Sequence, residues 1–213
     1  MKYMIHTCNA RLWYVQQYLK PSLEKQGIKE SNIKIWLDEE NKGNLASTLE
    51  SFSSLPKSGY TWHLQDDVVV CSDFKERTEN LEQDLCAGFC SIYDSSKYYG
   101  PCRPSVMWYS FQCYKIPNAY AHQFVKWVQQ KDEEQDSKYF IQITNNMFDD
   151  YLFKEFLKEK HSNDIGLNVY PNLVENIDFL IGGSTLVKRE EMMVSEYFME
   201  PGLVCRLADE IMQ

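Results

Sequence analysis

The sequence predicts a single α/β domain with a mainly parallel central sheet flanked by helices. Its first 75 residues alternate strand-like and helix-like patterns in the order β-α-β-α-β, which is typical of a parallel sheet. The composition is 44% hydrophobic with only 9 Gly and 7 Pro in 213 residues, as in a folded globular protein. No repeat or linker-like stretch divides the chain, so we expect one domain over residues 1–213.

Charge and cysteine content narrow the protein class. The net charge of −9 opposes broad non-specific binding to nucleic acid. The seven cysteines are odd in number and form no CxxC pair, which favours reduced thiols over a disulfide framework or a zinc site. No apolar run approaches the roughly 20 residues of a membrane span. The first eight residues are also too short for a signal peptide, so we expect a soluble, cytoplasmic protein without membrane contact.

The first β-α unit is predicted at the start of the chain. Residues 2–8 (KYMIHTC) have the composition of a buried central strand. Asn9 is a candidate N-cap for a helix that carries Leu12, Val15 and Leu19 on one face, and Gly27 is expected to end it.

The second strand, residues 33–37 (IKIWL), ends at Asp38. An acidic loop with Asn41 and a glycine follows, and α/β folds place ligands at such loops after parallel strands. Residues 44–52 then have the pattern of an amphipathic helix.

Residues 60–74 (YTWHLQDDVVVCSDF) contain the most unusual pattern in the chain. Asp66 and Asp67 stand side by side between two apolar runs, and adjacent carboxylates at the edge of a core persist mainly where a cation or hydrogen-bond donors compensate them. A divalent metal is one explanation, because Mg²⁺ sites use one or two carboxylates plus substrate phosphates. The alternative is a turn with two solvated acids. His6 and His63 lie in apolar strands and are expected to be hydrogen-bonded core residues.

The second half of the chain is patterned less regularly. We expect a helix over about residues 74–84, an amphipathic helix over 120–130 and a charged, solvated connector over 131–138. Strands are expected at residues 86–93 and 106–114. A further helix carries Asp149 and Asp150 in its first turns, where the helix dipole by itself favours acids. A closing helix is expected from about residue 189.

Several segments, in this order, match a known pattern. They are the first strand with Thr7 and Arg11, the Asp38 strand end with NKGN, the LQDDV strand, the Asp149–Asp150 pair and the late PNLVENI segment. Together they resemble the GT-A class of nucleotide-sugar glycosyltransferases, whose fold is Rossmann-like, and are most similar to short stand-alone members of bacteria and bacteriophages. The resemblance implies a nucleotide-sugar-binding half over residues 1–75 and an acceptor-side half over 76–213.

The resemblance also implies roles for individual residues. Those that would bind the nucleotide sugar, with a UDP-sugar favoured, are Thr7, Arg11, Asp38, Asn41 and Asp66. The acidic signature of the class, DxD, reads Gln65-Asp66-Asp67 in this chain, which makes Asp67 the preferred ligand for Mn²⁺ or Mg²⁺. Asn176 stands where many members have a histidine that completes the metal shell.

The implied reaction is sugar transfer to a hydroxyl with inversion at the anomeric carbon. Asp149 or Asp150 would be the general base, with Asp149 favoured. The acceptor implied by phage-type relatives is a hydroxylated DNA base, and a glycan or protein hydroxyl is the alternative. A phage-encoded enzyme would act in the host cytoplasm.

Two other functions are alternatives. A sugar nucleotidyltransferase shares the nucleotide cleft, but its glycine-rich signature after the first strand is absent from this sequence. A non-catalytic nucleotide- or carbohydrate-binding protein on the same fold is favoured if Gln65 and Asn176 reflect lost metal binding.

Overall fold

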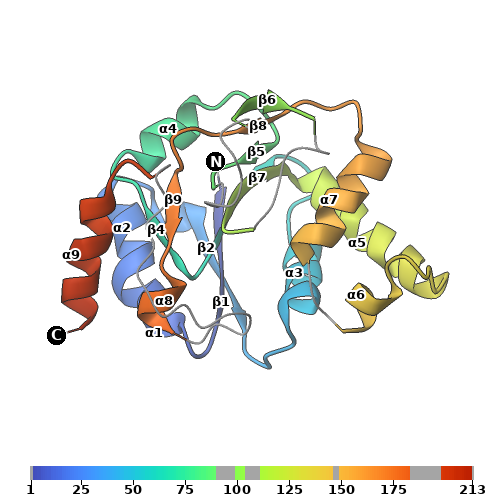
Figure 1. Cartoon of the computed structure of the whole chain (residues 1–213), viewed down its shortest axis with the longest axis horizontal. Helices are drawn as coiled ribbons and strands as arrows, with labels where there is room; N and C mark the ends of the chain where they lie inside the picture. Colours follow the sequence, from blue (N-terminus) through green and yellow to red (C-terminus); the bar gives the residue numbers. More distant parts are fainter. Residues whose placement is uncertain (1, 90–98, 104–110, 146–148, 183–197, 213) are drawn as a thin grey trace.

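A seven-stranded sheet with helices on both faces forms the centre of the protein (Figure 1). This computed structural model describes residues 2–89, 99–103, 111–145, 149–182 and 198–212. The strands of the sheet are β1 (Lys2–Cys8), β2 (Ile33–Asp38), β3 (Tyr60–Gln65), β5 (Cys86–Ala87), β6 (Gly100–Cys102), β7 (Cys113–Pro117) and β8 (Gly166–Asn168). Their order is β2-β1-β3-β7-β5-β8-β6, and a separate two-stranded sheet pairs β4 (Val68–Val70) with β9 (Val174–Asn176).

The central sheet is mainly parallel, as the sequence predicts. β1 pairs in parallel with both β2 and β3, and β5 pairs in parallel with β8. β7 is antiparallel to both β3 and β5, and β6 is antiparallel to β8. Five strands (β1, β2, β3, β5 and β8) therefore run in one direction, and β7 and β6 run in the other. The α/β class with a mainly parallel sheet is confirmed.

Helices cover both faces of this sheet (Figure 1). On one side lie α1 (Leu12–Tyr14), α2 (Lys20–Lys25), α4 (Phe74–Asn80) and α9 (Pro201–Ile211). On the other lie α3 (Asn44–Ser53), α5 (Asn118–Glu133) and α7 (Asp149–Lys160). The remaining helices are the π-helical η1 (Val15–Leu19), the 3-10 helix η2 (Glu30–Asn32), α6 (Phe140–Thr144) and α8 (Asp178–Ile181). Among the described residues, none of these helices combines the length and apolar character needed to cross a membrane.

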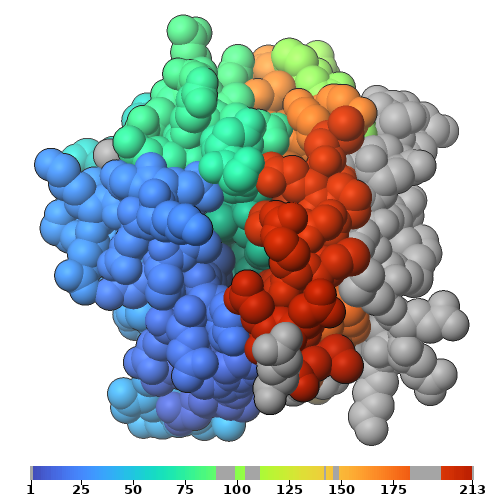
Figure 2. Space-filling view, turned by 90° about the vertical axis from the view of Figure 1, so that its left-hand side faces the viewer, coloured from blue at the N-terminus to red at the C-terminus, as the bar shows by residue number. Residues whose placement is uncertain are grey.

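Each face of the sheet has its own hydrophobic core, because successive strand side chains point to opposite faces. On β1, Tyr3 and Ile5 join the core under α2, α4 and α9, whereas Met4 joins the core under α3, α5 and α7. The C-terminal helix contributes Val204 and Leu207 to the first of these cores. Figure 2 shows this helix, in red, beside segments from the N-terminal part of the chain, in blue, on one face of the molecule.

The first helical segment differs in detail from its prediction. Asn9 does not cap it, and its side-chain amide instead donates to the carbonyl of Glu39, 2.9 Å away. The helix runs through η1 before α2 begins at Lys20. Pro21 lacks the N–H that would bond the carbonyl four residues earlier, and the wider π-helical turn directly precedes it.

Residues 60–74 divide between two sheets. β3 ends at Gln65 in the central sheet, and β4 starts at Val68 in the small sheet with β9. Asp66 and Asp67 form the turn between them. The change of sheet explains how two acids interrupt an apolar run without entering a strand.

The later elements are displaced from their predicted positions. The described part of the predicted strand 86–93 is short, since β5 ends at Ala87. The strand expected at 106–114 is observed at 113–117, and α5 follows it directly at Asn118. α5 continues to Glu133, so the start of the expected connector is helical. Residues 90–93, 106–110 and 183–197 of these predictions lie outside the described residues.

Candidate active site

Arg11 stands at the centre of a cluster of acidic side chains. It lies in the turn after β1, and its backbone N–H bonds the carbonyl of Cys8 at 3.1 Å. Its Nη1 is 3.0 Å from Asp66 Oδ1 and 3.7 Å from Asp67 Oδ2. Its Nη2 bonds Asp178, and its Nε donates to the carbonyl of Gly182 at 3.0 Å. One guanidinium therefore joins the end of β1, the β3–β4 turn and α8.

Asp66 and Asp67 have different surroundings although they are neighbours. Asp66 accepts hydrogen bonds from Arg11 and, at 3.4 Å, from the backbone N–H of Cys8. Asp67 Oδ2 accepts a hydrogen bond of 3.0 Å from the side-chain amide of Asn176. Asp67 Oδ1 is buried and has no hydrogen-bond partner among the described residues. Burial, together with the nearby Asp66 carboxylate, raises the pKa of Asp67 to about 7.

Asn176 and Asp178 reach the cluster from the other end of the chain. Asn176 is the last residue of β9, and the next backbone N–H, that of Ile177, donates to the carbonyl of Asp67 at 2.8 Å. Asn176 Oδ1 accepts the backbone N–H of Asp178 at 3.2 Å. Asp178 is not among the residues that the sequence pattern singles out. The available signal was a third acid two residues after Asn176 in the segment already singled out.

The predicted nucleotide-binding residues lie along the carboxyl ends of the parallel strands. Asp38 ends β2 and is paired in register with Cys8, at the end of β1. Its Oδ1 accepts the backbone N–H of Lys42 at 3.0 Å, which closes the acidic loop. Asn41 in that loop has a φ of 52°, in the left-handed region that asparagine tolerates. Thr7 is buried, and its hydroxyl donates to the carbonyl of Cys8 at 3.3 Å.

Asp149 and Asp150 are placed differently, at the start of α7. Asp149 is buried and accepts from the Thr48 hydroxyl of α3 at 2.7 Å and from the backbone N–H of Asp150 at 3.0 Å. Burial, and then the adjacent Asp150 charge, raises the pKa of Asp149 to about 6. Asp150 is less buried, and its carboxylate accepts the N–H of Tyr151 at 2.7 Å. None of the hydrogen bonds described for these two acids reaches Arg11 or the acidic cluster.

A second group of metal-ligand types lies elsewhere. The Cys71 thiol and the carboxylates of Asp73 and Glu200 lie within 4.8 Å of one another. Burial raises the pKa of the Cys71 thiol to about 12, so the thiol stays protonated at neutral pH. Arg77 Nη1 is 3.7 Å from the sulfur, which places a positive charge where a metal would bind. We therefore assign no metal to this group.

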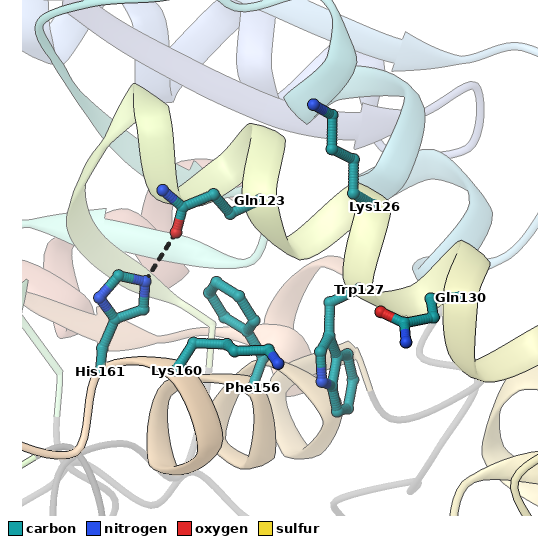
Figure 3. Close-up of a pocket in the computed structure, with 7 residues that line it drawn as sticks. All are labelled: Gln123, Lys126, Trp127, Gln130, Phe156, Lys160 and His161. Carbon is teal, nitrogen blue, oxygen red and sulfur yellow. Dashed lines mark hydrogen bonds between the residues drawn. The ribbon is translucent and has the colours of Figure 1, made fainter.

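A groove of about 400 Å³ lies between α5 and α7 (Figure 3). Its lining residues are Gln123, Lys126, Trp127, Gln130, Phe156, Lys160 and His161. His161 Nε2 bonds Gln123 Oε1 at 2.8 Å across its edge. The groove is on the α5–α7 side of the molecule, whereas the acidic cluster lies near α1 and α8 (Figure 1). It is therefore separate from the cluster.

Comparison with known proteins gives similarity at the level of structure. No protein-family model matches the sequence, and no curated protein matches it. Among solved structures, galactosyltransferase LgtC, in complex with donor and acceptor sugar analogues, aligns over 80% of this chain and 73% of its own, with 12% identity and a TM-score of 0.43. The glycosyltransferase GlyE of Streptococcus pneumoniae TIGR4 aligns over 79% of this chain, with 12% identity and a TM-score of 0.45. HddC of Yersinia pseudotuberculosis aligns over 58% of this chain and 80% of its own, with 11% identity and a TM-score of 0.30.

The likeness is one of fold. Two of these three proteins are glycosyltransferases by description. The chain spans 45% of the length of GlyE, so much of that protein has no counterpart in it.

Proposed function

We propose that this protein is a glycosyltransferase that moves a sugar from a nucleotide-sugar donor, with a UDP-sugar favoured, to a hydroxyl acceptor. The observation that carries the proposal is the acidic cluster at the carboxyl ends of β1 and β3, where α/β folds bind nucleotides. Within it, Asp67 Oδ1 is buried and has no hydrogen-bond partner among the described residues. A buried carboxyl oxygen of this kind is stabilised by a proton or by a bound ligand such as a cation.

The residues of the cluster fit a divalent cation, Mn²⁺ or Mg²⁺. Asp67 would hold it through Oδ1, with Asn176 beside it as the second candidate ligand. Both ends of the Asn176 amide are engaged, the nitrogen with Asp67 and the oxygen with the Asp178 N–H, and the oxygen keeps a second lone pair that could bind a metal. A cation bound there supplies Lewis-acid stabilisation of the leaving nucleoside diphosphate.

The remaining roles are those that the resemblance implies. Asp38, Asn41 and Thr7 line the same edge of the sheet and would bind the base and ribose. Asp149 or Asp150 would take the proton of the acceptor hydroxyl, and the pKa of Asp149, raised to about 6 by burial, suits a general base. The acceptor we propose is a hydroxylated base of phage DNA, with a glycan as the alternative, and the reaction would take place in the cytoplasm.

The test is Asp67→Asn, an isosteric change that removes the charge. We expect Mn²⁺-dependent UDP binding, measured by isothermal titration, and donor turnover to fall at least about tenfold, because the cation loses its principal ligand. The melting temperature should change little or rise, since the variant removes a buried charge that is partly unpaired. Full activity in this variant would remove Asp67 from the site.

The second candidate is a nucleotide- or carbohydrate-binding protein that performs no transfer. It is favoured by the Arg11 guanidinium, which already neutralises Asp66 and Asp178. A donor-hydrolysis assay with Mn²⁺ across a panel of nucleotide sugars separates the two. Saturable binding without hydrolysis or transfer for any donor would favour the binding protein.

A further inference from the structure

We infer that Arg11 is a built-in competitor of the divalent cation: its guanidinium holds Asp66 and Asp67 in the metal-free protein and must withdraw from them when the metal binds. This inference rests on the proposed function, which supplies the metal. It adds a property of this chain's own residues, namely that metal affinity is set by how firmly Arg11 is held.

The geometry of Arg11 carries the inference. Nη1 lies 3.0 Å from Asp66 Oδ1 and 3.7 Å from Asp67 Oδ2, so this one nitrogen stands between the two carboxylates. The Arg11 side chain is 10% exposed, and the side chains of Asp66 and Asp67 are 9% and 16% exposed. A divalent cation bound to these carboxylates would lie within a few ångströms of Nη1, in surroundings where water screens little. The two positive groups therefore exclude each other.

The other end of Arg11 is anchored independently. Nη2 bonds Asp178, and Nε donates to the carbonyl of Gly182 at 3.0 Å. Both groups belong to α8 or follow it directly, so Arg11 can lose its contact with Asp66 and still be held by α8. Asp178, which already bonds Nη2, then holds the guanidinium when the metal binds Asp67 and Arg11 moves away from Asp66 and Asp67.

The experiment measures the affinity of Mn²⁺ alone, and of Mn²⁺ with UDP, by isothermal titration for the wild type and for the double variant Arg11→Gln/Asp178→Asn. The double change removes one positive and one negative charge, so the net charge of the cluster is preserved while the competitor is lost. We expect the dissociation constant for Mn²⁺ to decrease at least about tenfold in the double variant. A purely structural role for Arg11 would instead weaken Mn²⁺ binding, because the site would be less well ordered.

Two further variants make the result specific. Lys20→Gln removes a partly exposed, salt-bridged lysine of α2 and tests whether any lost positive charge has the same effect. We expect no change in its Mn²⁺ affinity. Asp67→Asn reports whether the measured metal is bound at this cluster at all.

A measurement on the wild-type protein tests the inference without requiring that any variant folds. A guanidinium held by carboxylates rotates slowly and gives separate Nη signals in ¹⁵N NMR. We expect the Arg11 Nη signals to shift or merge as diamagnetic Mg²⁺ is added in the presence of UDP. Signals that stay unchanged at saturating Mg²⁺ would overturn the inference.

The outcomes separate the two proposals. Equal or weaker Mn²⁺ binding in the double variant, with binding lost in Asp67→Asn, would overturn the competition and leave the proposed metal site intact. Absence of Mn²⁺ binding in every protein, with and without UDP, would overturn both.

Discussion

Asp67 is the residue whose charge is least compensated in the acidic cluster. Asp66 has Arg11 and a backbone N–H, whereas one oxygen of Asp67 is buried without a described partner. In the metal-free protein Asp66 is therefore engaged by Arg11, whereas Asp67 has one oxygen that is available to a ligand. Burial raises the pKa of Asp67 to about 7, and this raised pKa reflects the difference in surroundings.

A prediction at the residue scale concerns Asp149 and Asp150. The Asn variant of the residue that acts as base should still bind the nucleotide and Mn²⁺, because the described contacts of both acids lie away from the cluster. Sugar transfer should fall by about 10²- to 10⁴-fold. Only one of the two variants should show this loss, since neighbouring helix residues point about 100° apart.

The structure gives each acid one advantage for this role. Asp149 has the pKa better matched to a base, whereas Asp150 is the more exposed. Transfer rates of both variants and NMR assignment of the product anomer decide between them. Retention of configuration, or full activity in both variants, would leave the pair as acids favoured by the helix dipole.

At the scale of elements, Gly88 lies in a tightly packed junction of β5 with β7 and the segment before β9. The Gly88 N–H donates to the carbonyl of Cys113 at 2.8 Å, and its own carbonyl accepts the N–H of Leu173 at 2.7 Å. A Cβ on Gly88 would lie 2.6 Å from Cys113 Sγ and 2.9 Å from Leu173 Cδ1. These contacts join the central sheet to the strand that carries Asn176.

We therefore expect Gly88→Ala to destabilise the protein by about 1 to 3 kcal/mol, the usual effect of overpacking a closed core. Gly202→Ala is the matched control, because a Cβ there lies 3.8 Å from the flexible Arg206 side chain. Alanine within α9 should be neutral or stabilising. Urea unfolding followed by tryptophan fluorescence measures both variants, and equal stability of the two would show that the β5–β7 junction relaxes freely.

At the scale of the whole molecule, two buried histidines and a buried aspartate lie on one face of the sheet. His6 and His63 are buried in neighbouring strands and share a hydrogen bond of 2.8 Å between His6 Nε2 and His63 Nδ1, which confirms the expectation of hydrogen-bonded core histidines. Burial lowers the pKa of His6 to about 4, and burial together with His6 lowers the pKa of His63 well below its usual value. Asp149, buried between α3 and α7 on the same face, has its pKa raised instead.

These shifts act on stability with opposite signs. The histidines take up protons more readily in the unfolded chain, so the free energy of unfolding falls as the pH drops from about 6.5 toward 4. Asp149 takes up a proton more readily in the folded protein. Its ionisation therefore lowers stability as the pH rises from about 4 to about 6, and its protonation offsets part of the acid loss caused by the histidines.

Asp149→Asn should remove this offset. Between pH 7.5 and 4.5 the variant should lose on the order of 2 kcal/mol more stability than the wild type. Urea unfolding at the two pH values measures the difference, with Asp209→Asn, an exposed acid of α9, as the control. If the free energy of unfolding of wild type and Asp149→Asn changed equally with pH, the pKa of Asp149 would not be raised in the folded protein.

The sequence by itself determined the α/β class, the first three parallel strands, the helix at 44–52 and the burial of His6 and His63. It also singled out Asp66 and Asp67 as acids that interrupt an apolar run. These features depend on local periodicity and on burial of a side chain within its own element, and both can be read along the chain. The roles of Asp38, Asn41, Thr7 and Asn176 stay predictions, although the structure places these residues at the same edge of the sheet or at the acidic cluster.

Only the tertiary structure decided which distant groups meet. Arg11 bonds Asp66 and Asp178, which are 55 and 167 residues away, and Asp149 bonds Thr48 across 101 residues. The insertion of the antiparallel β7 between β3 and β5, and the change of sheet at Asp66–Asp67, are likewise absent from any local pattern. Such contacts depend on how the helices and loops pack on the two faces of the sheet. Arg11 is therefore the cation found among these acids, for which the sequence pattern had left open a divalent metal, hydrogen-bond donors or a solvated turn.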